Sequence, residues 1–284
     1  MNVQDNGINK WLAAYPTIAL LVFFLAPFLT MLAVSFFARV EGAFFEPAFQ
    51  FANYVRFLSP FFGKVLLNSL GLSTAASIIA VCLAFPFTLF ISNTRRKEQT
   101  LVLVFILSVL SLSEVIIGFA WSTLLSQTAG IGNLFAWLGF IDEPRAYTPS
   151  LTALLLGLVY LGFPYAVLVV YPAISRLDPE IPEAARMLGA SPIRSFFTII
   201  IPIMRRTILG AFILVFVFTL GAYLLPQVLG RPHHWTLSVH ITDQAIFQSN
   251  VPFAAAMAVV LLLVSLALVG MSLTLGNDKK GAQT

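Results

Sequence analysis

Long apolar stretches alternate with short polar segments along the whole chain. Six of these stretches reach the roughly 20 residues that an α-helix needs to cross a bilayer. They cover about residues 11–37, 65–91, 101–125, 151–174, 207–230 and 253–275. Because they occupy most of the 284 residues, the pattern predicts an all-α membrane protein. We expect a single transmembrane domain, residues 1–284, with six membrane helices.

Composition agrees with this interpretation and excludes several functions. Hydrophobic residues make up 59% of the chain and charged residues only 10%, far from the balance of a water-soluble domain. The single cysteine, Cys82, lies inside an apolar stretch, which excludes a disulfide framework and a redox pair. The basic residues form short clusters and no continuous basic face, so we expect no nucleic-acid partner.

The basic residues are distributed unevenly among the segments that join the predicted helices. An even number of crossings places both termini on one side, and the positive-inside rule identifies that side. One side collects Lys10, Arg95, Arg96, Lys97, Arg176, Arg186, Arg194, Arg205, Arg206, Lys279 and Lys280, and the other collects Arg39, Arg56, Lys64, Arg145 and Arg231. The imbalance predicts that both termini are cytoplasmic.

The longest predicted cytoplasmic segment, residues 175–206, has the pattern of two short helices joined by a tight turn. The pair Asp178-Pro179 is suited to cap and begin the first helix. Gly189 stands where a helix ends in the left-handed conformation, and the pair Ser191-Pro192 can start the second helix. The segment is therefore predicted to be a helical hairpin.

Residue chemistry alone leaves two interpretations of this hairpin open. Ala184, Ala185 and Ala190 would let another protein approach the backbone closely, and Met187 and Leu188 offer apolar contact. This combination favours a docking element. The alternative is an amphipathic hairpin that lies on the lipid headgroups.

The spacing of residues in this segment resembles a known family pattern. Glu183-Ala184-Ala185 is followed after three residues by Gly189, after nine more by Ile199, and then by Ile201-Pro202. This run is similar to the EAA loop of binding-protein-dependent ABC importer permeases, and it departs from the usual pattern at Ile201, where leucine is common. The resemblance assigns ATPase coupling to Glu183, Ala184, Ala185, Gly189, Ala190 and Pro202.

The resemblance also implies the assembly in which such a chain works. It implies the type I, MetI-like importer permease fold in a bacterial inner membrane. The partners it implies are a second homologous permease, two ATP-binding subunits and an external substrate-binding protein. Because the sequence has no G-x-x-x-x-G-K-S/T run to cradle phosphates, we expect no cofactor in this chain, with ATP and Mg²⁺ bound by the partner ATPase. We therefore expect a transport subunit and not an enzyme.

Shorter matches elsewhere are similar to the spermidine/putrescine permease subfamily. They include Asn53-Tyr54, Asn68-Ser69-Leu70, Ser113-Glu114, Gly221-Ala222-Tyr223 and Leu225-Pro226. The resemblance implies import of a polyamine or a related small organic cation. Importers with similar loops carry iron, thiamine, phosphonates or amino-sugar compounds, and these cargoes stay open. A secondary transporter driven by an ion gradient is a further alternative, although the sequence shows no inverted repeat and one intramembrane acid.

Four residues are candidates for the substrate path. Glu114 lies within the third predicted span, where a carboxylate must face the bundle interior. It can attract a cationic cargo, or it can be a protonated or hydrogen-bonded packing residue. Trp121, Tyr223 and Gln227 combine apolar bodies with polar tips and suit an organic cation, although such residues also anchor helices at the membrane interface.

Two further sets of polar residues have simpler interpretations. A polar stripe in the second span suits contacts between helices, and it consists of Asn68, Ser69, Ser73 and Ser77. Three histidines in the predicted outer segment lack the spacing of a metal site, and they are His233, His234 and His240. We expect ordinary surface or interface residues there, with a pH-sensitive contact as the alternative.

Overall fold

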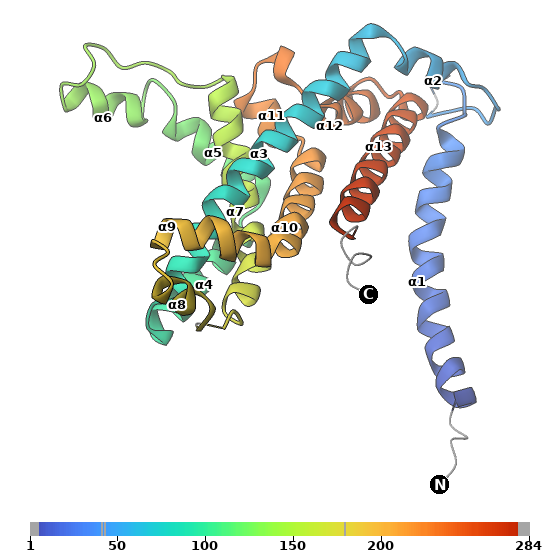
Figure 1. The fold of residues 1–284 in the computed structure, drawn as a ribbon. Coiled ribbons are helices and arrows are strands. Elements are labelled where there is room, and N and C mark those ends of the chain that lie inside the picture. The colour runs from blue at the N-terminus through green and yellow to red at the C-terminus, as the bar shows by residue number, and fades with distance from the viewer. Residues whose placement is uncertain (1–5, 41, 43, 179, 278–284) are drawn as a thin grey trace. The chain divides into compact units, whose positions relative to one another are not determined.

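The computed structural model describes residues 6–40, 42, 44–178 and 180–277 (Figure 1). Within these residues, pairing of extended segments is limited to one bridge between Ala38 and Glu46. The chain divides into two compact units, residues 1–63 with 240–263 and residues 64–239 with 264–284. The assignment of one transmembrane domain to residues 1–284 stays a prediction. Pro179, Lys279 and Lys280 lie outside the described residues.

Almost all regular structure in the described part of the chain is helical. The helices are α1 Asn6–Val34, α2 Ala52–Phe57, α3 Pro60–Ser92, α4 Arg96–Leu110, α5 Glu114–Leu124, α6 Ile131–Trp137, α7 Leu151–Ile174, α8 Glu180–Met187, α9 Pro192–Ser195, α10 Ile201–Gly221, α11 Leu224–Leu229, α12 Leu237–Thr242 and α13 Val251–Asn277. Two π-helical turns, Phe196–Ile200 and Asp243–Phe247, and one 3-10 turn, Pro232–His234, complete the list.

Five helices of the described chain are long and apolar enough to cross a membrane. They are Ala14–Val34, Pro60–Ser92, Leu151–Ile174, Pro192–Gly221 and Val251–Thr274. The pair α4 and α5 makes a sixth if it is one broken span, and its two halves are bent by 97°. The expected all-α membrane architecture is confirmed.

Two of the predicted spans differ most from the observed helices, and the others apart from residues 151–174 differ by a few residues at their ends. The third, predicted as continuous over residues 101–125, is interrupted after Leu110, because Ser113 leaves the helical conformation and caps α5. The fifth, predicted over residues 207–230, begins at Pro192 and ends at Gly221. Its early start follows from the π-helical turn, which carries α9 into α10 without a break.

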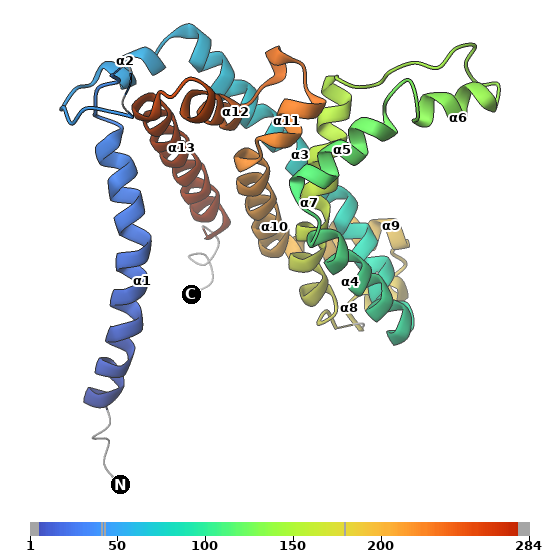
Figure 2. The same ribbon diagram turned by 180° about the vertical axis from the view of Figure 1, so that it is seen from behind.

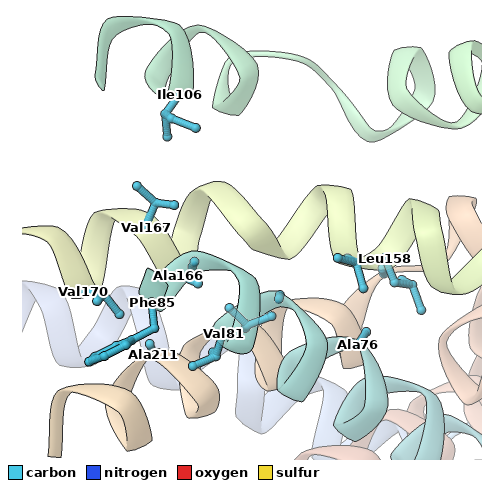
Figure 3. Packing of buried hydrophobic residues seen from close by; sticks show 14 of the residues in the cluster. Ala76, Val81, Phe85, Ile106, Leu158, Ala166, Val167, Val170 and Ala211 are labelled. Atoms are coloured by element: carbon cyan, nitrogen blue, oxygen red, sulfur yellow. The ribbon is translucent and has the colours of Figure 1, made fainter. Parts of the chain in front are cut away.

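Helix α7 organises the core of the second unit. It contacts α4, α5, α10 and α11, and α11 also lies beside α5 (Figures 1 and 2). Its buried residues share one apolar cluster with residues of α3 and α10. Figure 3 shows part of this cluster, in which Ala76 and Phe85 of α3 lie beside α7. Small side chains at Ala80, Ala166 and Ala211, all fully buried, let these helices approach closely.

The first unit is held by contacts between the segment after α1 and helix α2. The amide of Asn53 donates hydrogen bonds to the carbonyls of Ser35 and Phe37 at 2.9 and 3.1 Å. Tyr54 shares a hydrogen bond of 2.7 Å with the Ser35 hydroxyl. In the same unit the Arg56 guanidinium lies 4.2 Å from the centre of the Phe253 ring, which is a cation–π contact.

Glycine at position 162 is required by the close packing of α7 and α10. A Cβ atom added at Gly162 would lie 2.5 Å from the Val215 side chain, whereas one added at Gly210 on α10 would meet nothing within 4 Å. We expect Gly162→Ala to destabilise the folded protein by about 1–3 kcal/mol through overpacking. Gly210→Ala should leave stability equal or raise it slightly. Thermal unfolding of the purified protein in detergent measures both, and equal midpoints for the two variants would contradict this packing.

Candidate functional site

The helical hairpin predicted within residues 175–206 is present as α8, a turn and α9. The Asp178 carboxylate accepts a hydrogen bond of 3.0 Å from the Glu180 N–H, so it caps α8. The Ser191 hydroxyl accepts one of 3.2 Å from the Arg194 N–H, so it caps α9. Between them Gly189 has a φ of +84°, a conformation that glycine adopts at little cost. The predicted caps and helix stop are confirmed at these positions.

The turn after α8 also satisfies the carbonyl groups at the end of that helix. The Leu188 N–H donates to the Ala184 carbonyl at 3.2 Å, and the Ala190 N–H donates to the Ala185 carbonyl at 3.0 Å. These bonds use carbonyls that a helix end otherwise leaves unpaired. The tight turn therefore holds α8 and α9 in a fixed relation.

Two large apolar side chains project from this turn. Met187 is 89% exposed and Leu188 is 90% exposed, whereas Ala185 on the same helix is buried. Leu188 and Met187 thus have almost no contact with the rest of the described chain. Apolar side chains presented together in this way are typical of a surface that another molecule covers.

The inner side of the hairpin faces a pocket of about 370 Å³. Glu183 and Arg186 of α8 line it together with Asn93, which follows α3, and Asp178, which precedes α8. Among the other residues assigned to coupling, Ala184 and Gly189 are exposed, and Pro202 lies exposed in the first turn of α10. Two charged side chains of α8, Glu183 and Arg186, thus line this pocket, whereas Met187 and Leu188 lie outside its lining.

A second candidate site surrounds Glu114, the first residue of α5. One carboxylate oxygen, Oε1, accepts hydrogen bonds of 3.0 Å from both the Leu224 and the Leu225 N–H groups at the start of α11. Helices α5 and α11 pack closely here, since the position of a Cβ at Gly118 is 3.6 Å from Leu225. Glu114 is therefore hydrogen-bonded to the backbone of a neighbouring helix.

Glu114 also lines a pocket of about 480 Å³. The other lining residues belong to α7, to the end of α10 and to the turns beside the broken helices: Leu112, Leu161, Tyr165, Val217, Phe218, Gly221 and Ala222. The Tyr165 and Phe218 rings lie against each other with centroids 4.1 Å apart. A carboxylate beside two aromatic rings is suited to an organic cation.

The remaining predicted path residues lie outside the described lining of this pocket. Trp121 packs edge to face on Tyr160 of α7, with ring centroids 5.7 Å apart. Tyr223 is 38% exposed and precedes α11, and its carbonyl accepts a hydrogen bond from the Gln227 N–H. Sequence reasoning missed Tyr165 and Phe218, although a tyrosine directly after Pro164 in an apolar span is an available signal.

Within the part of the chain that the structure describes, one residue of the polar stripe in the second span, Ser69, joins two helices. The buried Ser69 hydroxyl donates to the Val65 carbonyl and accepts from the Leu237 N–H at the start of α12, both at 2.7 Å. Ser77 bonds only to the Ser73 carbonyl of its own helix, and the Ser73 hydroxyl has no hydrogen-bond partner among the described residues. Ser69 therefore fulfils the expected role of joining helices.

The neighbouring histidines His233 and His234 lie in the turn between α11 and α12. Their ring centroids are 3.9 Å apart, and Nδ1 of His234 accepts a hydrogen bond of 3.3 Å from the Arg231 N–H. Partial burial, followed by the positive charges of His233 and Arg231, lowers the pKa of His234. The neutral ring that the hydrogen bond needs is thus favoured.

Five described helices that are long and apolar enough to cross a membrane, with α4 and α5 as a possible broken sixth span, define a multi-pass membrane protein. The model of the family described as binding-protein-dependent transport system inner membrane component matches residues 84–277, and the chain belongs to this family. It is similar to the spermidine/putrescine transport system permease protein PotB of Escherichia coli strain K12, with 31% identity over 247 residues, 86% of this chain and 89% of that protein. The chain is accordingly a permease subunit of an ABC importer and not an enzyme.

Solved structures of importers share this fold. A chain of a bacterial alginate ABC transporter, in complex with an alginate pentasaccharide-bound periplasmic protein, has a TM-score of 0.74 at 19% identity over 97% of this chain and 96% of that chain. A chain of the MetNI methionine ABC transporter in an inward-facing conformation has a TM-score of 0.50 at 14% identity, over 78% of this chain and 97% of that chain. The predicted type I importer permease fold is confirmed.

Ser69 and Ser73 offer a matched pair for testing the contact between α3 and α12. We expect Ser69→Ala to destabilise the protein by about 1–3 kcal/mol, because it leaves the buried Leu237 N–H without an acceptor. Ser73→Ala removes a hydroxyl that makes no hydrogen bond and should be neutral or stabilising. Thermal unfolding in detergent compares the two variants, and an equal loss of stability in both would show that the Ser69 bond is unimportant.

Acid should weaken the turn that holds His234. Because its pKa is lowered on folding, the unfolded chain binds more protons, so local stability is complete above the ordinary histidine pKa of about 6.5 and is lost as the pH falls through the folded pKa. Replacing His233 by Asn removes one like charge and should raise the pKa of His234 by less than about one unit. Titration of the histidine ring signals by NMR measures this, and an unchanged or lower pKa would contradict it.

Proposed function

We propose that this chain forms the path for a polyamine or a related small organic cation in an ATP-driven, binding-protein-dependent importer. The observation that carries the choice of cargo is the pocket in which the Glu114 carboxylate lies with the rings of Tyr165 and Phe218. An ammonium group gains from a carboxylate by charge and from aromatic faces by cation–π attraction. The similarity to the Escherichia coli spermidine/putrescine permease supports the same cargo.

The remaining path residues are assigned by their place on the same two helices. Trp121 lies on α5. Tyr223 directly precedes α11, and Gln227 lies within that helix. These are the helices that Glu114 joins through its hydrogen bonds. We assign the three residues to contacts with the cargo on either side of the carboxylate.

The hairpin of α8 and α9 is assigned to the ATPase subunit. Its support is the pair of exposed apolar side chains Met187 and Leu188, together with the fixed turn at Gly189. A docking role also accounts for the Glu183-Ala184-Ala185 run and for Ala190 and Pro202 on the same segment. The proposed assembly contains a second homologous permease, two ATP-binding subunits that hold ATP and Mg²⁺, and an external substrate-binding protein.

The excess of basic residues on one side of the predicted spans supports the orientation of this assembly. It favours cytoplasmic termini and a cytoplasmic hairpin in the bacterial inner membrane, where the ATPase can reach Met187 and Leu188. The pocket at Glu114 then receives cargo from the binding protein on the outer side when the bundle opens outward.

Reconstitution of the complete complex in vesicles tests this proposal. Spermidine-loaded or putrescine-loaded binding protein should stimulate ATP hydrolysis and uptake. Leu188→Ser should abolish most of the stimulation and weaken retention of the ATPase, because it removes apolar contact from the interface. Leu58→Ser is the matched control, since Leu58 is 80% exposed in the other unit.

Each outcome of this experiment separates one part of the proposal from another. Retained coupling in Leu188→Ser would overturn the docking assignment. ATP-driven uptake of iron, thiamine, a phosphonate or an amino-sugar compound in place of polyamine would overturn the cargo and leave the importer. Uptake that follows an ion gradient without the ATPase would overturn the whole proposal.

A further inference from the structure

Two interrupted helices of the second unit meet at a single carboxylate. Helices α4 and α5 are bent by 97° at the Ser111–Ser113 turn, and Glu114 is the first residue after it. Helix α10 ends at Gly221, and after the extended residue Ala222 the chain resumes as α11. The Glu114 carboxylate, at the first interruption, accepts a hydrogen bond from the Leu224 N–H at the second interruption, 110 residues further along the sequence.

The interruption between α10 and α11 depends on this contact because it exposes backbone groups. The N–H groups that follow a helix break have no partner within their own helix, and in an apolar surrounding an unpaired N–H is costly. Oε1 of Glu114 satisfies two of them, those of Leu224 and Leu225. Among the described residues no hydrogen bond uses Oε2, which belongs to the same charged group.

The same carboxylate forms part of the pocket wall. Of the eight described residues that line this pocket, Glu114 is the one with a charge. Gly221 and Ala222, which form the end of α10 and the break itself, are lining residues as well. A cation in the pocket would therefore meet both the carboxylate and the backbone that the carboxylate holds in place.

We infer that Glu114 is a positioning residue that links the α4–α5 break to the α10–α11 break through its two hydrogen bonds. We call this link the Glu114 tie. A cationic group in the pocket weakens the tie because it interacts with the same carboxylate. One negative charge then serves two partners. A cation at Oε2 withdraws charge from Oε1 and weakens its charge-assisted bonds to Leu224 and Leu225. The identity of the cation as cargo rests on the proposed function. The hydrogen bonds of Glu114 to Leu224 and Leu225, and their weakening by a positive charge, do not rest on it.

Hydrogen exchange of the Leu224 and Leu225 amides measures the tie in the assembled complex. Glu114→Ala removes both acceptors and should speed exchange at these amides by roughly tenfold or more. Glu114→Gln keeps an amide oxygen that can accept the same bonds, so exchange should stay within about threefold of the native rate. Glu98→Gln is the matched control, because Glu98 caps α4 and bonds to the Arg95 N–H.

A charged group placed beside Glu114 tests whether a charge in the pocket changes the hydrogen bonds to Leu224 and Leu225. In a Cys82→Ser background, Gly221→Cys puts a thiol at a lining position where an added Cβ meets nothing within 4 Å. Methanethiosulfonate reagents that carry a trimethylammonium or a sulfonate group attach either charge to that thiol. The cationic reagent should react roughly fivefold faster than the anionic one. Its adduct should also speed exchange at Leu224 and Leu225, whereas the anionic adduct should not.

The Glu114→Gln variant tests whether the negative charge of Glu114 causes both the preference for the cationic reagent and the faster exchange in its adduct. In that variant the preference for the cationic reagent should disappear and the two adducts should give equal exchange, while Glu98→Gln should retain both effects. Unchanged exchange in Glu114→Ala, or an equal cationic preference with and without the carboxylate, would overturn the inference. Because no reagent here is a transported cargo, failure of polyamine uptake leaves these outcomes intact and bears on the proposed function alone.

Discussion

The need to pair backbone groups wherever a membrane helix is interrupted governs this structure. A broken helix leaves N–H and carbonyl groups without partners, and an apolar surrounding offers no water to replace them. The chain meets this need with side chains, since Ser113 caps α5, Ser69 accepts from the start of α12, and Glu114 accepts from the start of α11. These three polar residues lie where the backbone requires a partner, and the carboxylate is one of them.

Close packing around α7 determines where that carboxylate can lie. Small residues such as Gly162 and Ala166 let α3 and α10 approach the helix, and α5 and α11 contact it as well. The same helix contributes Tyr165 to the wall of the Glu114 pocket. One helix thus provides both the packing core of the second unit and an aromatic face of the candidate cation site.

The amino-acid sequence predicts local features well and long-range contacts poorly. Hydrophobic length located the apolar helices, with α7 at its observed bounds, and cap chemistry at Asp178, Gly189 and Ser191 located the hairpin. The Ser113-Glu114 pair carries a similar cap signal, but hydrophobic length hid the interruption before it. The bonds of Glu114 to Leu224 and Leu225 depend on the packing of α5 against α11, which no local pattern encodes.

The two candidate sites lie at opposite ends of one continuous helix. The run Pro192–Gly221 has 30 residues and includes the π-helical turn Phe196–Ile200. Its first residues belong to the hairpin and its last line the Glu114 pocket. The extended residue Ala222 follows Gly221, and it is where the backbone can absorb a change of direction between α10 and α11. The hydrogen bonds of Glu114 act directly beyond this point, on the first two residues of α11, so they hold the start of α11 against α5.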